Sequence, residues 1–81
     1  MEGNLQRRVG DYLRAYRLQR GLSQERFAEV VGVHRTYMGA IERGEENLTL
    51  KSVERLATIL DTDPLNLFLP YPSSPNNDLD S

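Results

Sequence analysis

Residues 21–44 read GLSQERFAEVVGVHRTYMGAIERG, and this stretch decides the fold. A short helix is predicted to begin after Ser23, because a serine hydroxyl accepts from the open N–H groups of a helix N-terminus. Gly32 then ends that helix, since glycine adopts the positive φ that a tight turn requires. A second helix is predicted over about residues 35–43, ending at Gly44. The predicted inward-facing residues are Phe27, Ala28 and Val31 on the first helix and Met38 and Ile41 on the second.

The two helices and the turn between them form a helix-turn-helix pattern. Counting Gln24 as position 1, Ala28 falls at position 5, Gly32 at 9, Met38 at 15 and Ile41 at 18. Ala28 allows the helices to cross closely, while Met38 and Ile41 seat the second helix on the core and leave its other face exposed. This pattern favours DNA binding. Helical hairpins in unrelated bundles also turn at glycine, so a protein-interaction module on the same scaffold, such as an antitoxin or adaptor, stays open.

The flanking sequence predicts three further helices and a tail. One helix covers about residues 4–20, and another begins after Thr49. A short fifth helix over residues 65–69 follows the capping residue Asp63, and residues 70–81 are predicted to be a disordered tail. The expected fold is all-α, a compact five-helix bundle. Its apolar stripes are Leu5, Val9, Tyr12, Leu13 and Tyr16 in the first helix and Val53, Leu56, Ala57 and Leu60 in the fourth.

Composition restricts the functions that the chain can perform. It has 81 residues, enough for one modest domain, and no cysteine and one histidine, which excludes a disulfide framework and a zinc cluster. No apolar run approaches the ~18 residues of a spanning helix and no signal peptide is evident, so we expect a cytoplasmic protein with no membrane partner. No glycine-rich phosphate loop is present, and the adjacent Glu45 and Glu46 are expected on a loop as solvated charge. We therefore expect neither an enzyme nor a cofactor or metal site.

Charge is divided unevenly along the chain. Residues 1–44 hold eight arginines against five acidic residues, a net charge of +3. Residues 45–81 hold two basic residues against seven acidic ones, a net charge of −5. The basic half indicates a face that can meet phosphate. A mixed, solvated surface is the alternative, and charge alone does not choose between them.

The motifs of this chain resemble those of a known family. The segments GLSQE at residues 21–25 and IERG at residues 41–44 are similar to the phage repressor and Cro family of helix-turn-helix regulators, also called the XRE family. The segments HRTY at residues 34–37 and NLT at residues 47–49 are more similar to the controller proteins of restriction-modification systems. The resemblance covers about residues 7–69.

This resemblance implies a lambda-repressor-like DNA-binding fold over residues 1–69, working as a homodimer on a pseudo-palindromic operator in double-stranded DNA. For controllers it implies activation and repression of neighbouring promoters, for which RNA polymerase is a candidate partner. It also implies an ion pair between Arg17 and Glu42, although from sequence alone each residue could equally be solvated.

On the family pattern, the recognition helix begins after His34. Arg35 is the strongest candidate for base reading, because a guanidinium can bond both O6 and N7 of guanine, and a solvated arginine is the alternative. Tyr37 either lies against the sugar-phosphate wall or packs on the core, and His34 either bonds a phosphate when protonated or is a neutral cap residue. Gln24 is expected at a phosphate. The predicted DNA-binding residues are Gln24, Arg35, Thr36, Tyr37, Gly39, Ala40, Arg43, Asn47, Thr49 and Lys51.

The predicted dimer interface consists of the apolar residues Leu65, Leu67, Phe68 and Leu69, which lie within five residues of one another. So small a bundle cannot easily cover all four on its own core, so some of them should face a two-fold partner. A two-fold dimer would place its recognition helices about 34 Å apart, one turn of B-DNA.

The loop after the recognition helix departs from the controller pattern. Controllers resembling this chain usually have Glu-Arg-Asn where it has Glu45, Glu46 and Asn47, so an acid replaces a basic residue. Glu46 either points away from DNA, weakens binding on purpose, or marks a variant with damaged binding. We favour weakened binding, because phosphates repel a carboxylate.

Overall fold

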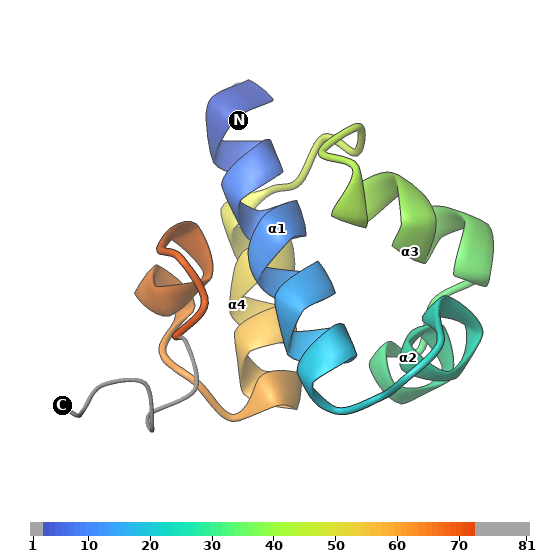
Figure 1. Cartoon of the computed structure of the whole chain (residues 1–81). Coiled ribbons are helices and arrows are strands. Elements are labelled where there is room, and N and C mark those ends of the chain that lie inside the picture. The colour runs from blue at the N-terminus through green and yellow to red at the C-terminus, as the bar shows by residue number, and fades with distance from the viewer. Residues whose placement is uncertain (1–2, 73–81) are drawn as a thin grey trace, which may run out of the picture.

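The computed structural model describes residues 3–72, which form four α-helices and one short 3-10 helix. These are α1 (Gly3–Gln19), α2 (Gln24–Val31), α3 (Arg35–Glu42), α4 (Leu50–Leu60) and the 3-10 helix η1 (Pro64–Phe68). In Figure 1, α1 and α4 occupy the middle of the molecule, with α2 and α3 to one side and η1 to the other. Within this range, no helix combines the length and the apolarity needed to span a bilayer.

The prediction of a fifth α-helix is wrong, because this segment forms the 3-10 helix η1. Asp63 caps it as expected, with Oδ1 accepting from the N–H of Leu65 at 2.9 Å, and Pro64 lies in its first turn. Five residues are too few to repay the entropy of nucleating an α-helix, whereas short segments commonly adopt 3-10 geometry. The all-α class is confirmed, with four α-helices within residues 3–72.

Side-chain caps confirm the predicted helix starts. Ser23 caps α2 and Thr49 caps α4, and each hydroxyl accepts a backbone N–H at 3.0 Å. His34 caps α3 through Nδ1, which accepts from the N–H of Thr36 at 3.1 Å. Gly32 ends α2 with a φ of 85°, as predicted.

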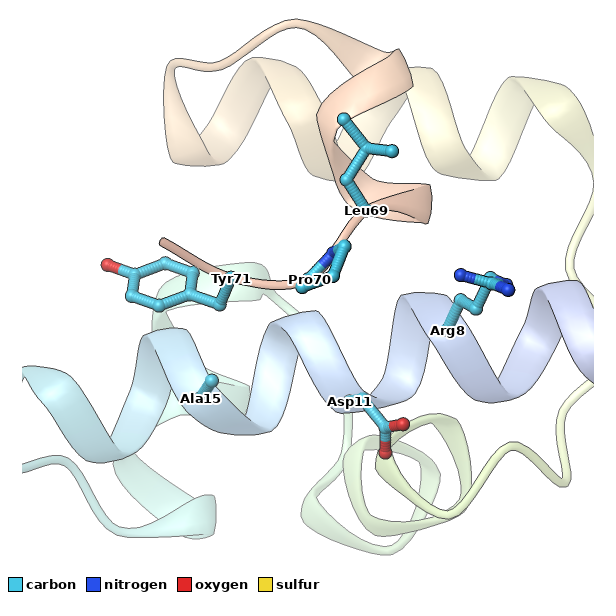
Figure 2. Close-up of a pocket in the computed structure, with 6 residues that line it drawn as sticks. All are labelled: Arg8, Asp11, Ala15, Leu69, Pro70 and Tyr71. Atoms are coloured by element: carbon cyan, nitrogen blue, oxygen red, sulfur yellow. The ribbon is translucent and has the colours of Figure 1, made fainter. Parts of the chain in front are cut away.

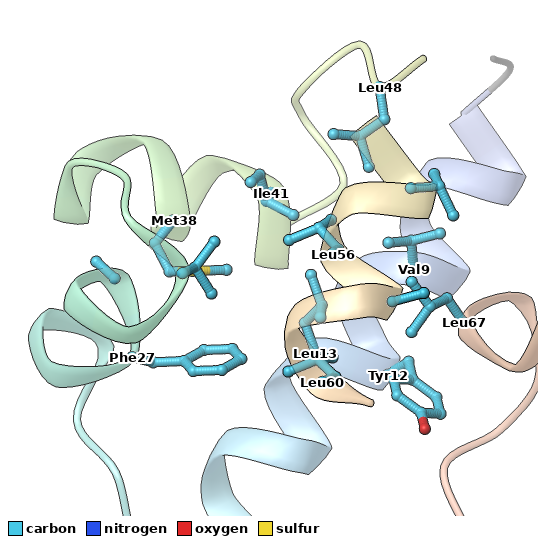
Figure 3. Packing of buried hydrophobic residues seen from close by; sticks show 14 residues of the cluster. Val9, Tyr12, Leu13, Phe27, Met38, Ile41, Leu48, Leu56, Leu60 and Leu67 are labelled. Carbon is cyan, nitrogen blue, oxygen red and sulfur yellow. The ribbon is translucent and has the colours of Figure 1, made fainter. Parts of the chain in front are cut away.

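One apolar core joins the helices (Figure 3). The inward faces predicted for α2, α3 and α4 are all buried. The predicted stripe of α1 is confirmed except at Leu5, which is 42% exposed, and Tyr16 is half-buried against the core. The buried cluster consists of Val9, Tyr12, Leu13, Phe27, Ala28, Val31, Met38, Ile41, Leu48, Val53, Leu56, Ala57, Leu60 and Leu67.

The chain beyond η1 stays in contact with α1 as far as Tyr71. The Tyr71 ring lies edge-on to those of Tyr12 and Tyr16, with centroids 5.1 and 6.2 Å apart. Arg20 Nη1 donates to the Tyr71 hydroxyl at 3.2 Å. Tyr71 belongs to the segment predicted as a disordered tail, and these contacts place it on the folded domain. The rest of that segment, residues 73–81, lies outside the described residues.

Candidate nucleic-acid interface

The end of α3 is in direct backbone contact with α1. A Cβ atom at Gly10 would lie 2.6 Å from the carbonyl oxygen of Glu42 and closer still to that of Ile41. Backbone atoms cannot turn aside as the end of a long side chain can, so any side chain at Gly10 would push the last turn of α3 away from α1. Glycine at this position therefore sets the distance between the two helices.

A buried ion pair holds the same end of α3. Arg17 Nε and Nη2 donate to Glu42 Oε2 and Oε1 at 2.8 and 3.1 Å. Arg17 Nη1 also donates to the carbonyl oxygen of Leu22 at 3.0 Å. The ion pair that the family resemblance implied is therefore confirmed, and it is bidentate. Two parallel bonds fix direction as well as distance, so this pair orients α3 relative to α1.

Gln24 extends this network to the start of α2. Its Nε2 donates to Glu42 Oε1 at 3.1 Å. Because an ionised carboxylate can only accept, the amide nitrogen is turned toward Glu42, and Oε1 lies beside Gly39. The sequence prediction placed Gln24 at a phosphate and missed this bond, since a contact across 18 residues leaves no local pattern.

The exposed face of α3 and the start of α2 border a shallow hollow of about 250 Å³. Five of the predicted DNA-binding residues line this hollow, and two of them are exposed arginines. Their cationic groups make the hollow attractive to phosphates and to the acceptor atoms of base edges. The lining residues are Gln24, Arg35, Thr36, Gly39 and Arg43.

Gly39 makes room for two of these side chains. A Cβ atom added there would lie 3.1 Å from Arg43 Nη1 and 3.3 Å from Gln24 Oε1. The ends of both side chains thus occupy the space next to Gly39. The sequence prediction placed Gly39 among the DNA-binding residues and did not anticipate that two side chains of the chain itself would occupy the space beside it.

Tyr37 lies on another flank of α3. It borders a small pocket together with Ser52 and Arg55 of α4, and it is 37% exposed. The residue therefore meets the body of the domain and keeps an exposed edge. The sequence left open whether Tyr37 packs on the core or lies against the sugar-phosphate wall, and this position has a packed side and an exposed edge.

The remaining predicted DNA-binding residues lie outside the hollow. Asn47 and Lys51 are exposed, on either side of the start of α4, and Ala40 is half-buried on α3. The hydroxyl of Thr49 accepts the helix-capping N–H, so its first role is structural.

Glu45 is a residue of this surface that sequence reasoning missed. Its Oε1 lies 3.1 Å from Arg43 Nε, and both side chains are exposed. The sequence prediction treated Glu45 as solvated loop charge, because a pair across a helix end depends on how the chain turns at Gly44.

Of the four residues predicted to form the dimer interface, the structure buries some and exposes others. Leu67 is fully buried in the core of its own chain, so assigning it to the interface is wrong, because it has no surface to offer a partner. Phe68 is half-buried against the same core. Leu65 and Leu69 are 71% and 54% exposed, and they are the apolar side chains that this segment leaves uncovered.

Leu69 also borders a hollow of about 320 Å³ between α1 and the chain that follows η1 (Figure 2). In Figure 1, η1 and the chain that follows it lie across α1 and α4 from α3. The hollow is lined by Arg8, Asp11 and Ala15 of α1 and by Leu69, Pro70 and Tyr71.

Comparison with known proteins supplies a family and several relatives. The model of a family described as a helix-turn-helix domain matches residues 8–67. Control protein C.SmaI of Serratia marcescens is 46% identical over 54 residues, which are 67% of this chain and 64% of that protein. Control protein C.BamHI of Bacillus amyloliquefaciens is 35% identical over 68 residues, which are 83% of this chain and 84% of that protein. The match thus spans a little under two thirds of C.SmaI and most of C.BamHI.

A solved structure agrees with these relatives. The crystal structure of the restriction-modification controller protein C.AhdI from Aeromonas hydrophila superposes with a TM-score of 0.65 at 42% sequence identity. The match covers 76% of this chain and 94% of that one. The relatives compared are named as control or controller proteins, which fits the expectation that this chain is not an enzyme.

Proposed function

Because this chain belongs to the helix-turn-helix domain family, we propose that it is a sequence-specific DNA-binding regulator of transcription. The observation that carries the proposal is the hollow at α3, where exposed Arg35 begins the helix, exposed Arg43 caps its end, and Glu42 ties the helix to α1. A recognition helix must present its side chains to the major groove at a constant angle. The ion pair at Glu42 and the close contact at Gly10 provide that constancy.

The residues at α3 divide into two roles in this proposal. Arg35 and Thr36, in the first turn of α3, read base edges, since the N-terminal residues of a recognition helix enter the groove. Arg43, Asn47 and Lys51 lie at or beyond the other end of the helix, where they contact the phosphate backbone.

The proposed assembly is a homodimer formed through η1. Leu65 in η1 and Leu69 directly after it are large exposed apolar side chains, and η1 itself lies across α1 and α4 from α3 (Figure 1). Pairing them across a two-fold axis removes them from water and leaves both copies of α3 free, so residues 1–69 serve both DNA binding and dimerisation. A dimer of this kind reads a pseudo-palindromic operator with half-sites about 10 base pairs apart.

The proposed targets are restriction-modification genes. C.SmaI, C.BamHI and C.AhdI are all named as control or controller proteins, and the identities are 46%, 35% and 42%. A regulator acting at promoters would also meet RNA polymerase, which we propose as a further partner.

An electrophoretic shift assay tests the DNA-binding role. The chain should bind a preferred fragment among genomic DNA more tightly than random duplex. Arg35→Ala should cost about 1–3 kcal/mol on the preferred fragment and little on random DNA, because only base reading is lost. Lys51→Ala is the matched control and should weaken both complexes alike. Absence of any preferred fragment would overturn the proposal and favour a protein-interaction module.

A further inference from the structure

The cationic side chain at the C-terminal end of α3 is already paired within the chain. Arg43 Nε lies 3.1 Å from Glu45 Oε1, and the two side chains are 57% and 59% exposed. Arg43 also reaches over Gly39 with Nη1, at the rim of the hollow. A carboxylate therefore stands next to a guanidinium on the surface assigned to DNA.

The position of Glu45 is fixed by α3 itself. Its N–H donates to the carbonyl oxygen of Ala40 at 2.9 Å, and the N–H of Gly44 donates to that of Ile41 at 3.0 Å. Gly44 has a φ of 74°, and a Cβ atom there would lie 2.9 Å from Arg7 Cα, so the turn is packed against α1. This double hydrogen bond is a helix-terminating turn that holds the backbone of Glu45 close to Arg43.

The stability of α3 does not explain why an acidic residue, Glu45, follows its C-terminal end. The C-terminal end of a helix carries partial negative charge, so a carboxylate beside it is unfavourable, whereas the neighbouring arginine is favourable. What Glu45 does at this end is place a carboxylate in ion-pair contact with the guanidinium of Arg43. A phosphate oxygen would approach the same guanidinium, since carboxylate and phosphate are the anions that arginine binds.

We propose that Glu45 is a positioning residue that competes with DNA phosphate for Arg43 and so holds affinity down without changing base preference. This inference rests on the proposed DNA-binding function. To contact a phosphate, Arg43 must give up its Glu45 partner, and the carboxylate left behind repels the DNA backbone. Glu46 differs, because any effect it has on DNA comes from its own charge and not from a pair with Arg43.

A double-mutant cycle separates the pair from the general effect of charge. The variants are Glu45→Gln, Arg43→Ala and the two combined, each measured on the preferred fragment and on random duplex at low and physiological salt. Glu46→Gln, alone and with Arg43→Ala, is the matched control, since it removes the same charge one residue away. Thermal unfolding of each variant checks that the fold is intact.

The expected gain is modest because the pair is exposed. Glu45→Gln should tighten binding roughly 1.4- to 5-fold per subunit, equally on both DNAs. It should steepen the fall of log affinity with log salt by up to about 0.9 per subunit, as Arg43 then makes a full phosphate contact. In the Arg43→Ala background this gain should disappear, whereas any effect of Glu46→Gln should persist.

Two results would overturn the inference while leaving the proposed function intact. One is unchanged affinity and salt slope for Glu45→Gln in a protein that still prefers its fragment. The other is a gain that survives Arg43→Ala, which would make Glu45 a general charge rather than a competitor. If the unaltered chain shows no preferred fragment at all, the proposed function fails instead.

Discussion

The α3 side and the η1 side of this domain pack on one apolar core, but they differ in the contacts that are added to it. At α3 the buried Met38 and Ile41 are supplemented by directional contacts, which are the bidentate pair of Arg17 with Glu42 and the close approach at Gly10. At η1 the contacts are apolar, through the buried Leu67 and the half-buried Phe68. The α3 side leaves cations exposed, and the η1 side leaves leucines exposed.

The contrast matches what each surface is proposed to do. Hydrogen bonds to base edges depend on distances of a few tenths of an ångström, so the helix that makes them needs contacts that fix its direction. An apolar surface that joins two copies tolerates small shifts, because apolar burial is non-directional. Changes on the two sides should therefore have different consequences, and the four predictions below run from the largest expected effect to the smallest.

Arg17→Leu should cause the largest loss of stability. It leaves the Glu42 carboxylate, whose side chain is 2% exposed, without its cation. We expect the free energy of unfolding, measured by urea denaturation, to fall by about 3–5 kcal/mol. The control is Arg26→Leu, which breaks an ion pair with Glu29 whose side chains are 70% and 64% exposed, and which should cost about 0.5 kcal/mol or less. Similar losses in the two variants would show that α3 is not held by its buried pair.

The same contrast explains how far the sequence could predict the fold. Caps at Ser23, Thr49 and Asp63 depend on neighbours within three residues, so the sequence located them. In η1 the apolar residues are too few to show a period, so the sequence did not distinguish buried Leu67 from exposed Leu65. Helix periodicity needs several turns before it identifies the inward face.

The candidate site was predictable in its residue types and less so in its bonds. The family resemblance implied the Arg17–Glu42 pair, and the structure contains it. The bond from Gln24 to Glu42 depends on how α2 and α3 cross, which no local pattern records. The pair of Arg43 with Glu45 likewise depends on the turn that ends α3.

Gly10→Ala should cause the next largest loss, again in the free energy of unfolding. Its Cβ would meet backbone oxygens, whereas the same change at Gly39 meets only the ends of Gln24 and Arg43. Both glycines are inside helices, so both variants gain the same helix propensity, and the difference between them isolates the backbone contact. Gly10→Ala should be less stable than Gly39→Ala by roughly 1–3 kcal/mol in urea denaturation. Equal stabilities would mean that α3 can move off α1 without cost.

Leu65→Glu should weaken self-association with little change in folding. Leu65 is 71% exposed, so the substitution should alter the unfolding free energy by at most about 0.5 kcal/mol. It brings like charges together across the proposed two-fold interface, and sedimentation should show the dimer dissociation constant raised by about tenfold or more. Leu50→Glu is the control, because Leu50 is 70% exposed but begins α4, at the other end from η1. A monomeric unaltered chain, or equal weakening by both variants, would remove η1 from the interface.

Glu46→Arg should have the smallest effect, and it concerns the loop that precedes α4. Glu46 is half-buried in the loop between α3 and α4, at the position where the controller pattern has a basic residue. If it weakens binding, as we favour, Glu46→Arg should tighten the complex with DNA. The slope of log affinity against log salt should steepen by about 0.9 per subunit, because each new phosphate contact releases condensed counterions.

The control for that variant is Asp61→Arg, which makes the same change of charge at the far end of α4. It raises the net charge equally but brings no new cation to the loop, so its slope should stay near that of the unaltered chain. Equal slopes for the two variants would show that Glu46 acts only through net charge. An unchanged affinity and slope for Glu46→Arg would place this loop away from DNA. The DNA-binding side of the domain would then consist of α3 and its flanking residues without this loop.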